Sequence, residues 1–175
     1  MTSNVTKQDV KLILESYKAW KNLNISLGNF ASRTVNFPEA ISESLACFNL
    51  GYEWHNKTQT KKVGDATSGN GKLVEIKATS NFDRDLTSFS PKTKFEILIF
   101  ARLNLLYDEL YIYDLKMNFS EFEKMSVNSS QTIAEQQENK RRPRLSLVKY
   151  IEDKNMKPLS ILDLKKLGNE VGVTI

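Results

Sequence analysis

The sequence predicts one α/β domain over residues 1–175, in which a central mixed β-sheet of about four to five strands is flanked by α-helices. Its 175 residues, 40% hydrophobic and 26% charged, suffice for one sizeable core. The spacing of apolar residues is typical of helices near the N-terminus and typical of extended strands after Gly51. No internal repeat or low-complexity linker divides the chain, so helices, sheet and peripheral helices follow one another in a single unit.

Two helices are predicted before the sheet. The first runs from Thr6, whose side chain suits an N-cap, to about residue 27, and the second starts at Pro38 and ends at Gly51. Apolar residues recur at three- and four-residue spacing in the first helix, at Val10, Ile13, Leu14, Tyr17 and Trp20. Glu39 and Glu43 are four residues apart, so they share one face of the second helix.

The strands are predicted from extended apolar runs that lie between turn residues. The nearly continuous "KFEILIFARL" (94–103) is typical of a buried central strand, and "SGNG" (68–71) closes a hairpin of residues 62–67 and 72–78. The other expected elements are strands at 52–56 and 110–117, helices at 120–125 and 131–140, a short helix within 160–175, and a strand or helix at 145–151.

The composition excludes several kinds of site. Cys47 is the single cysteine, so neither a disulfide framework nor a thiolate zinc site can form. His55 is the single histidine, and its polar surroundings predict a solvated loop residue, which leaves a Ser-His-Asp apparatus without a candidate. The chain has neither an apolar run of membrane-spanning length nor a signal peptide pattern, and we expect a soluble, cytoplasmic protein.

The net charge of +4 is modest, but cationic residues gather at 57–62, 90–94 and 139–144. Such clusters suit a polyanion, and solvated loops are the alternative. Charge alone therefore does not decide the function.

A three-residue motif, an acidic residue followed by any residue and then lysine, occurs six times in the sequence. The copies start at Asp9, Glu75, Asp114, Glu138, Glu152 and Asp163. Side chains at i and i+2 share a face in a strand but not in a helix, which leaves the triplets at Glu75 and Asp114. Glu75 and Lys77 therefore project from one side of a strand, while Ile76 points into the core and leaves its carbonyl at the strand's edge. Asp108, the acid upstream of Asp114, lies in the intervening turn and is too near in sequence to come alongside Asp114.

Asp65 supplies a second carboxylate to the first of these triplets. In the predicted hairpin it lies on the strand next to Glu75, close enough for the two carboxylates to repel each other unless a cation lies between them. Mg²⁺ prefers oxygen ligands and is commonly held by one or two carboxylates together with water and substrate phosphate. The residues therefore predict a Mg²⁺ site, with a merely structural, solvated hairpin of the same charged residues as the alternative.

Asp65 followed by Glu75-Ile-Lys77 resembles the active-site signature of the PD-(D/E)XK nuclease superfamily, with Gly64 in place of the usual proline. The stretches "ISESLACFNLGY", "GDAT", "VEIKATS", "DLTSFSP" and "RRPRLSLVKYI", between residues 41 and 151, resemble small Type II restriction endonucleases, and most of all the group that cuts GCNGC sites. The resemblance implies a restriction-endonuclease-like fold. It also implies Mg²⁺-dependent hydrolysis of a phosphodiester bond in double-stranded DNA at a short GC-rich palindrome, with 5′-phosphate and 3′-hydroxyl ends.

The resemblance further implies a role for each residue of the site. The metal ligands would be Asp65, Glu75 and the backbone carbonyl of Ile76. Lys77, with a pKa lowered by partial burial and a nearby metal, would orient the attacking water and help to deprotonate it. The helix before "LGY" is similar to the acidic first helix of that fold, so Glu43, or else Glu39, would hold a metal-bound water or the lysine.

Two basic stretches are predicted to contact DNA. The loop after the catalytic strand carries Arg84, Ser88, Ser90, Lys92 and Lys94. The run "KRRPR" adds the guanidinium groups of Arg141, Arg142 and Arg144, which suit guanine O6 and N7 or phosphate. At least one of these three arginines is expected to read a base, and a solvated surface loop is the alternative for any single residue.

A palindromic site implies a homodimer with one active site for each strand. A restriction-modification system implies a cognate DNA methyltransferase as the genetic partner, because unprotected host DNA would be cut. The first helix, with Tyr17 and Trp20, or the stretch 107–115 is a candidate dimer interface, with core packing as the alternative. Two other functions stay open: a structure-specific nuclease of the same fold, such as a resolvase or repair enzyme, and a non-catalytic DNA-binding module.

Overall fold

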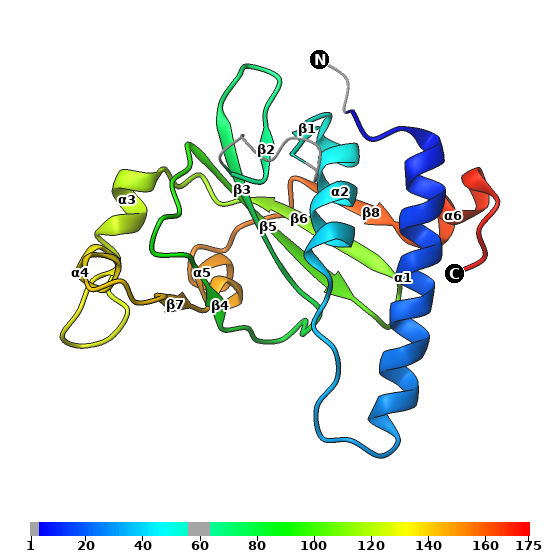
Figure 1. Cartoon of the computed structure of the whole chain (residues 1–175), viewed down its shortest axis with the longest axis horizontal. Coiled ribbons are helices and arrows are strands. Elements are labelled where there is room, and N and C mark those ends of the chain that lie inside the picture. The colour runs from blue at the N-terminus through cyan, green and yellow to red at the C-terminus, as the bar shows by residue number, and fades with distance from the viewer. Residues whose placement is uncertain (1–3, 56–63) are drawn as a thin grey trace.

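The fold is built on a mixed sheet of six strands, which is larger than the predicted four to five (Figure 1). The computed structural model describes residues 4–55 and 64–175. In spatial order the strands are β1 (Glu53–Trp54), β2 (Ala66–Thr67), β3 (Leu73–Thr79), β5 (Ile97–Asn104), β6 (Glu109–Asp114) and β8 (Ser160–Asp163). Only the pairing of β3 with β5 is parallel among these neighbours. The predicted mixed α/β architecture is thus confirmed.

The helices and a small second sheet cover the two faces of this sheet (Figure 1). The helices are α1 (Lys7–Gly28), α2 (Glu39–Leu50), α3 (Phe119–Glu123), α4 (Ile133–Glu138), α5 (Leu147–Asp153) and α6 (Leu164–Val171). Strands β4 (Thr87–Ser88) and β7 (Arg144–Leu145) form an antiparallel pair beside α3, α4 and α5. No helix of the described segments is long and apolar enough to cross a membrane.

Alternate residues of β5 build two separate cores. Ile99, Ala101 and Leu103 pack in the first core with side chains of α1, α2 and α6. Leu98 and Phe100 pack in the second core, on the opposite face, with side chains of α3, α4 and α5. All these β5 side chains are fully buried, as predicted for a central strand from its nearly continuous apolar run.

The two N-terminal helices follow their sequence signals closely. The Thr6 hydroxyl accepts a hydrogen bond from Asp9 N, and the Asp9 carboxylate accepts one from Thr6 N, which forms a capping box at the start of α1. Helix α2 begins at Glu39, one residue later than predicted, because Pro38 is extended (ψ 130°) and forms the N-cap. Gly51 ends the helix in the left-handed conformation (φ 69°), which glycine adopts without steric cost.

The structure refines two C-terminal predictions. The short helix predicted within 160–175 is confirmed as α6, which starts at Leu164 and is stopped by Gly172, and residues 160–163 before it form the unpredicted strand β8, which pairs with β6. Residues 145–151, left open between strand and helix, belong to the end of β7 and to α5. In addition, Tyr17 and Trp20 are buried in the first core, and therefore cannot form a dimer interface.

Candidate active site

A short hairpin formed by β2 and β3 positions the predicted catalytic residues. Ala66 pairs with Val74, and Thr67 pairs with Leu73. The Ser68 hydroxyl donates to the Asn70 side chain and accepts from Lys72 N, which shapes the turn. The hairpin predicted from residues 62–67 and 72–78 is therefore present, although residues 62 and 63 lie outside the described segments.

Asp65 lies next to the β2–β3 pairing, and its side chain reaches across to β3. Its backbone N–H donates to Val74 O at 3.0 Å, and one carboxylate oxygen accepts from Ile76 N at 2.7 Å. The N–H and C=O groups of one strand residue point to the same side of the strand. The Ile76 carbonyl therefore faces the side of β3 on which the Asp65 carboxylate lies.

Glu75 and Lys77 project from the same side of β3, as predicted from their spacing. Lys77 Nζ lies 2.6 Å from Glu75 Oε1, and both side chains are largely buried. Between them, Ile76 is 3% exposed and belongs to the first core. The Lys77 ammonium also lies 5.6 Å from the ring centroid of Phe89, within the range of a cation–π contact.

Burial disfavours the charged forms of the two carboxyl groups. Burial and repulsion by Asp65 raise the pKa of Glu75 despite the opposing attraction of Lys77. Burial also raises the pKa of Asp65, and it outweighs Lys77 and the hydrogen bond from Ile76. A cation placed beside this pair would therefore relieve an electrostatic cost that the lysine only partly offsets.

The predicted lowering of the Lys77 pKa relied on a nearby metal as well as on burial, and the protein's own groups act in the opposite direction. Burial lowers the pKa of Lys77, but attraction by Glu75, Asp65 and Glu39 outweighs burial and raises the pKa above its ordinary value. The ammonium form is therefore favoured in this environment.

Helix α2 brings two further carboxyl groups to the site. Trp54 Nε1 donates to Glu43 Oε2 at 3.0 Å, whereas Glu39 is exposed at the start of the helix. Burial and repulsion by Asp65 and Glu39, against the Trp54 hydrogen bond, raise the pKa of Glu43 to about 8. Both glutamates thus act electrostatically on the site, and Glu43 is the one held in place by a hydrogen bond.

The donor set fits a hard cation that keeps several waters. Within residues 4–55 and 64–175, no three His, Cys, Asp or Glu side chains gather into a group that could hold a metal ion. Asp65 and Glu75 supply only two carboxylates, and the carbonyl of Ile76 is a third oxygen on the same side. Two carboxylates with waters suit Mg²⁺ better than a fully protein-enclosed ion.

The hairpin has three neighbours that the sequence did not predict as site residues: Trp54, His55 and Phe89. His55 was expected to be a solvated loop residue, but it is half-buried and hydrogen-bonded to Gly64 O and the Thr67 hydroxyl. No local periodicity marks these residues. Their positions follow from pairing between segments that are distant in the chain.

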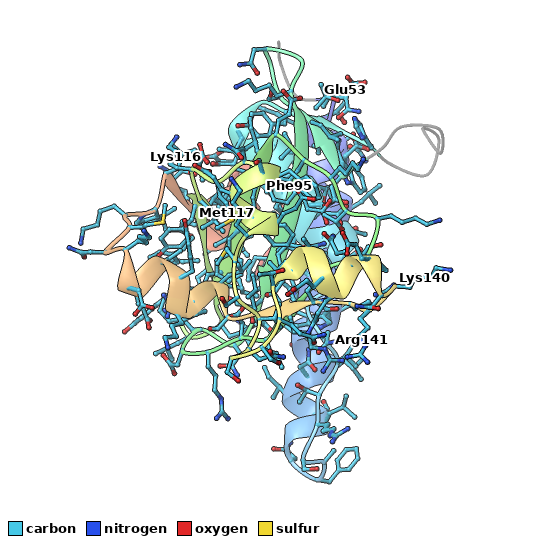
Figure 2. The ribbon with its side chains drawn as sticks, turned by 90° about the vertical axis from the view of Figure 1, so that its left-hand side faces the viewer. Glu53, Phe95, Lys116, Met117, Lys140 and Arg141 are labelled. Atoms are coloured by element: carbon cyan, nitrogen blue, oxygen red, sulfur yellow. The ribbon has the colours of Figure 1, made fainter. Side chains whose placement is uncertain are left out.

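The two stretches predicted to contact DNA lie side by side. Ser88 pairs with Arg144, Phe89 N donates to Pro143 O, and the Gln137 side chain donates to Ser90 O. Together, residues 84–94 and 137–145 form what we term the basic ribbon. Figure 2 views the molecule from this side and shows Lys140 and Arg141 at the end of α4. The cationic run at 57–62 lies outside the described segments.

The basic ribbon presents free cationic groups. Arg84, Arg141, Arg142 and Arg144 are exposed, and none has a hydrogen-bond or ion-pair partner for its side chain within the described residues. Lys92 and Lys94 line a hollow of about 490 Å³ between residues 91–94 and helices α3 and α4. The predicted catalytic residues do not line this hollow.

Comparison with known proteins assigns the family. The sequence model of a family described as "Bsp6I restriction endonuclease" matches residues 5–154. The chain belongs to the Bsp6I restriction endonuclease family. A curated relative, the Type II restriction enzyme Bsp6I of Bacillus sp. (strain RFL6), is 42% identical over 154 residues, which cover 87% of this chain and 86% of the relative. No solved structure matches the chain.

Membership of the Bsp6I family makes the chain a site-specific endonuclease. Type II restriction enzymes generally use divalent metal ions. The family match contains the hairpin, helix α2 and the basic ribbon, and it ends at Lys154, the residue that follows α5. Strand β8 and helix α6 lie beyond the Bsp6I family match.

Proposed function

We propose that the chain is a Type II restriction endonuclease that acts as a single PD-(D/E)XK nuclease domain over residues 1–175 with a restriction-endonuclease-like fold. It would hydrolyse phosphodiester bonds of double-stranded DNA at a short GC-rich palindrome, with GCNGC as the candidate site, and leave 5′-phosphate ends. One observation carries the proposal. In a chain of a restriction endonuclease family, Asp65, Glu75 and Lys77 converge on one face of a buried hairpin.

The oxygen donors of the hairpin would hold the cofactor, Mg²⁺. Its ligands would be Asp65, Glu75 and the carbonyl of Ile76, whose side of β3 is marked by the hydrogen bond from Ile76 N to Asp65. When bound, the ion would supply positive charge against the scissile phosphate and polarise water. The Ile76 side chain anchors the strand in the first core, so that these oxygens have little freedom to move.

Lys77 would orient the attacking water and interact with the scissile phosphate. Its carboxylate neighbours favour the ammonium form, so Lys77 Nζ is a hydrogen-bond donor at the start of the reaction. Deprotonation of the water by this group would require the amine form. Glu43, oriented by Trp54, would hold a water at the site, with Glu39 as the more exposed alternative.

The basic ribbon would bind and read the DNA. Its candidate contacts are Arg84, Ser88, Ser90, Lys92, Lys94, Arg141, Arg142 and Arg144. Exposed guanidinium groups without intramolecular partners suit phosphate or the O6 and N7 atoms of guanine. A palindromic site would be cut by a homodimer, and a DNA methyltransferase encoded nearby would protect the host.

Plasmid cleavage in the presence of Mg²⁺ tests the proposal. We expect discrete fragments with 5′-phosphate ends, and end sequencing would give the recognition site and the stagger. Nicking confined to branched DNA would instead indicate a structure-specific nuclease, and absence of cutting would indicate a binding module.

The catalytic assignment is tested by Asp65→Ala and Lys77→Gln. Each should reduce cleavage by at least about a thousandfold, because transition-state charge loses a partner, while DNA binding in a gel-shift assay stays within a fewfold. Lys116→Gln is the matched control, since Asp114-Leu-Lys116 repeats the same spacing away from Asp65. Full activity of either purified site variant would disprove the assignment.

A further inference from the structure

The backbone around Asp65 has few constraints of its own. Strand β2 contains only Ala66 and Thr67, and Gly64 on the other side has a φ of +76°. Proline is restricted to a φ near −65°, so the proline usual at this position of the PD-(D/E)XK signature could not adopt this conformation. Glycine is the most conformationally free residue. The aspartate that we assign to the metal therefore depends on contacts from outside its own segment.

His55 makes three of those contacts, on both sides of Asp65. Its backbone N–H donates to Asp65 O at 2.9 Å. Its ring Nδ1 lies 3.1 Å from Gly64 O, and its Nε2 lies 2.7 Å from the Thr67 hydroxyl. Two of the three bonds come from the imidazole side chain, so they are specific to this residue.

The partners of the ring define its hydrogen-bonding roles. A carbonyl oxygen can only accept, so Nδ1 must carry a proton and donate to Gly64 O. In the neutral ring Nε2 then accepts a hydrogen bond from the Thr67 hydroxyl. Because both nitrogens are engaged, the ring has no free lone pair with which to bind a metal or take a proton from water. This arrangement suits a support and not a catalytic base.

We propose that His55 is a positioning residue that holds the Gly64–Thr67 segment so that the Asp65 carboxylate stays at the metal site. The inference rests on the proposed function of Asp65. A carboxylate on an unsupported segment would have to be ordered when the ion binds, and that ordering opposes binding. Loss of groups that orient metal ligands typically costs about tenfold to a hundredfold in metal affinity.

Metal binding by the full-length protein is the test. Mn²⁺ serves as the probe, and the free ion is counted by electron paramagnetic resonance without DNA and without turnover. His55→Ala should weaken Mn²⁺ binding by about tenfold or more. His55→Asn, whose side-chain amide can place an N–H near the position of Nδ1, should recover binding to within about threefold of the parent. Thr67→Val, which removes the partner of Nε2, should give an intermediate loss.

A general loss of stability is controlled with Tyr17→Phe. Tyr17 lies on helix α1, away from the hairpin. Its hydroxyl donates to the buried Asp108 carboxylate at 2.6 Å. This variant should melt at a lower temperature but bind Mn²⁺ like the parent. If His55→Ala does not fold, Thr67→Val and His55→Asn still test the proposal.

The possible failures can be told apart through Asp65→Ala. If that variant binds Mn²⁺ as tightly as the parent, the proposed metal site is wrong whatever His55 does. If Asp65→Ala weakens binding but His55→Ala and Thr67→Val do not, the positioning role is wrong. His55→Asn binding as weakly as His55→Ala would overturn the assignment of the Nδ1 bond.

Discussion

Glu43 is a carboxyl group whose surroundings favour its neutral form. Burial comes first among the causes, followed by repulsion from Asp65 and Glu39, and together they raise the pKa to about 8 against the effect of the Trp54 hydrogen bond. The unfolded chain would lose this proton near pH 4.5. Between these two pH values the folded protein binds more protons than the unfolded one, so stability must fall as the pH rises.

Glu43→Gln should remove this pH dependence. In buffer free of divalent ions, we expect the variant to be more stable than the parent at pH 8 by roughly 1–3 kcal/mol, because the folded parent must then either keep a proton that the unfolded chain has released or hold a buried charge. At pH 5 the two proteins should have similar stability. Urea unfolding at pH 5, 7 and 8 measures the difference, with Glu15→Gln on the exposed surface of α1 as the control. Parallel pH profiles for parent and variant would contradict the assignment.

At the scale of elements, Asp85 joins the basic ribbon to helix α5. Its carboxylate accepts hydrogen bonds from the Thr87 and Ser146 hydroxyls and from the backbone N–H groups of Leu147 and Val148. A carboxylate at the first turn of a helix satisfies free N–H groups and interacts favourably with the helix dipole. One side chain thus fixes β4 and α5 relative to each other.

Asp85→Ala should loosen the ribbon while leaving the hairpin intact. We expect the free energy of unfolding to fall by about 1–2 kcal/mol, as for the loss of a helix cap. The KM for plasmid DNA should rise by about fivefold or more, while kcat stays within about twofold, since the proposed catalytic groups lie on the β2–β3 hairpin and on α2. Asp83→Ala, two residues earlier on the exposed loop, is the matched control. An equal fall in kcat would show that the ribbon also sets the catalytic geometry.

Elements with their own periodicity could be predicted, and elements that depend on a partner could not. Helices α1 and α2 carry an apolar stripe and end signals, and β5 carries a long apolar run. By contrast, β4 and β7 contain two residues each and exist only because Thr87 pairs with Leu145 and Ser88 with Arg144. Strand β8 is a four-residue edge strand, too short to distinguish from the start of the helix that follows it.

The same distinction explains which residues of the candidate site could be predicted from the sequence. Asp65, Glu75 and Lys77 could be grouped from sequence because strand geometry relates spacing to a shared face. Trp54 and His55 reach the site through tertiary contacts with Glu43 and Gly64, for which no pattern along the chain exists. The direction in which the protein's own groups shift the pKa of Lys77 could not be predicted, because attraction by neighbouring carboxylates depends on distances that the sequence does not contain.

At the scale of the whole molecule, cationic side chains lie on both sides of the sheet: the arginines of the basic ribbon on one side and the lysines of α1 on the other. The basic ribbon lies beside α3, α4 and α5, whereas α1 lies on the opposite side (Figure 1). The net charge of +4 is too small for the whole surface to attract DNA strongly. Binding should therefore depend on where the cations lie more than on their total number.

Salt dependence of DNA binding tests this. Replacing Arg141, Arg142 and Arg144 with alanine should reduce the slope of log affinity against log salt by about 2–3, since each lost phosphate contact removes about 0.9. The charge-matched variant with Lys7, Lys11 and Lys18 of α1 replaced by alanine should change the slope by less than about 1. Equal effects of the two variants would place the DNA elsewhere. A reduced slope with unchanged sequence preference would show that these arginines contact only phosphate.

The two cores on opposite faces of β5 bear on how this enzyme can diversify. Side chains that support helices α1, α2 and α6 are not those that support the ribbon, so substitutions in α3, α4 and α5 can accumulate without disturbing the first core. On the proposed role of the basic ribbon, new recognition sequences could therefore be selected by varying one face of the molecule. Phe89 is the residue of this face that should not be varied, because it belongs to the second core and also contacts the Lys77 ammonium.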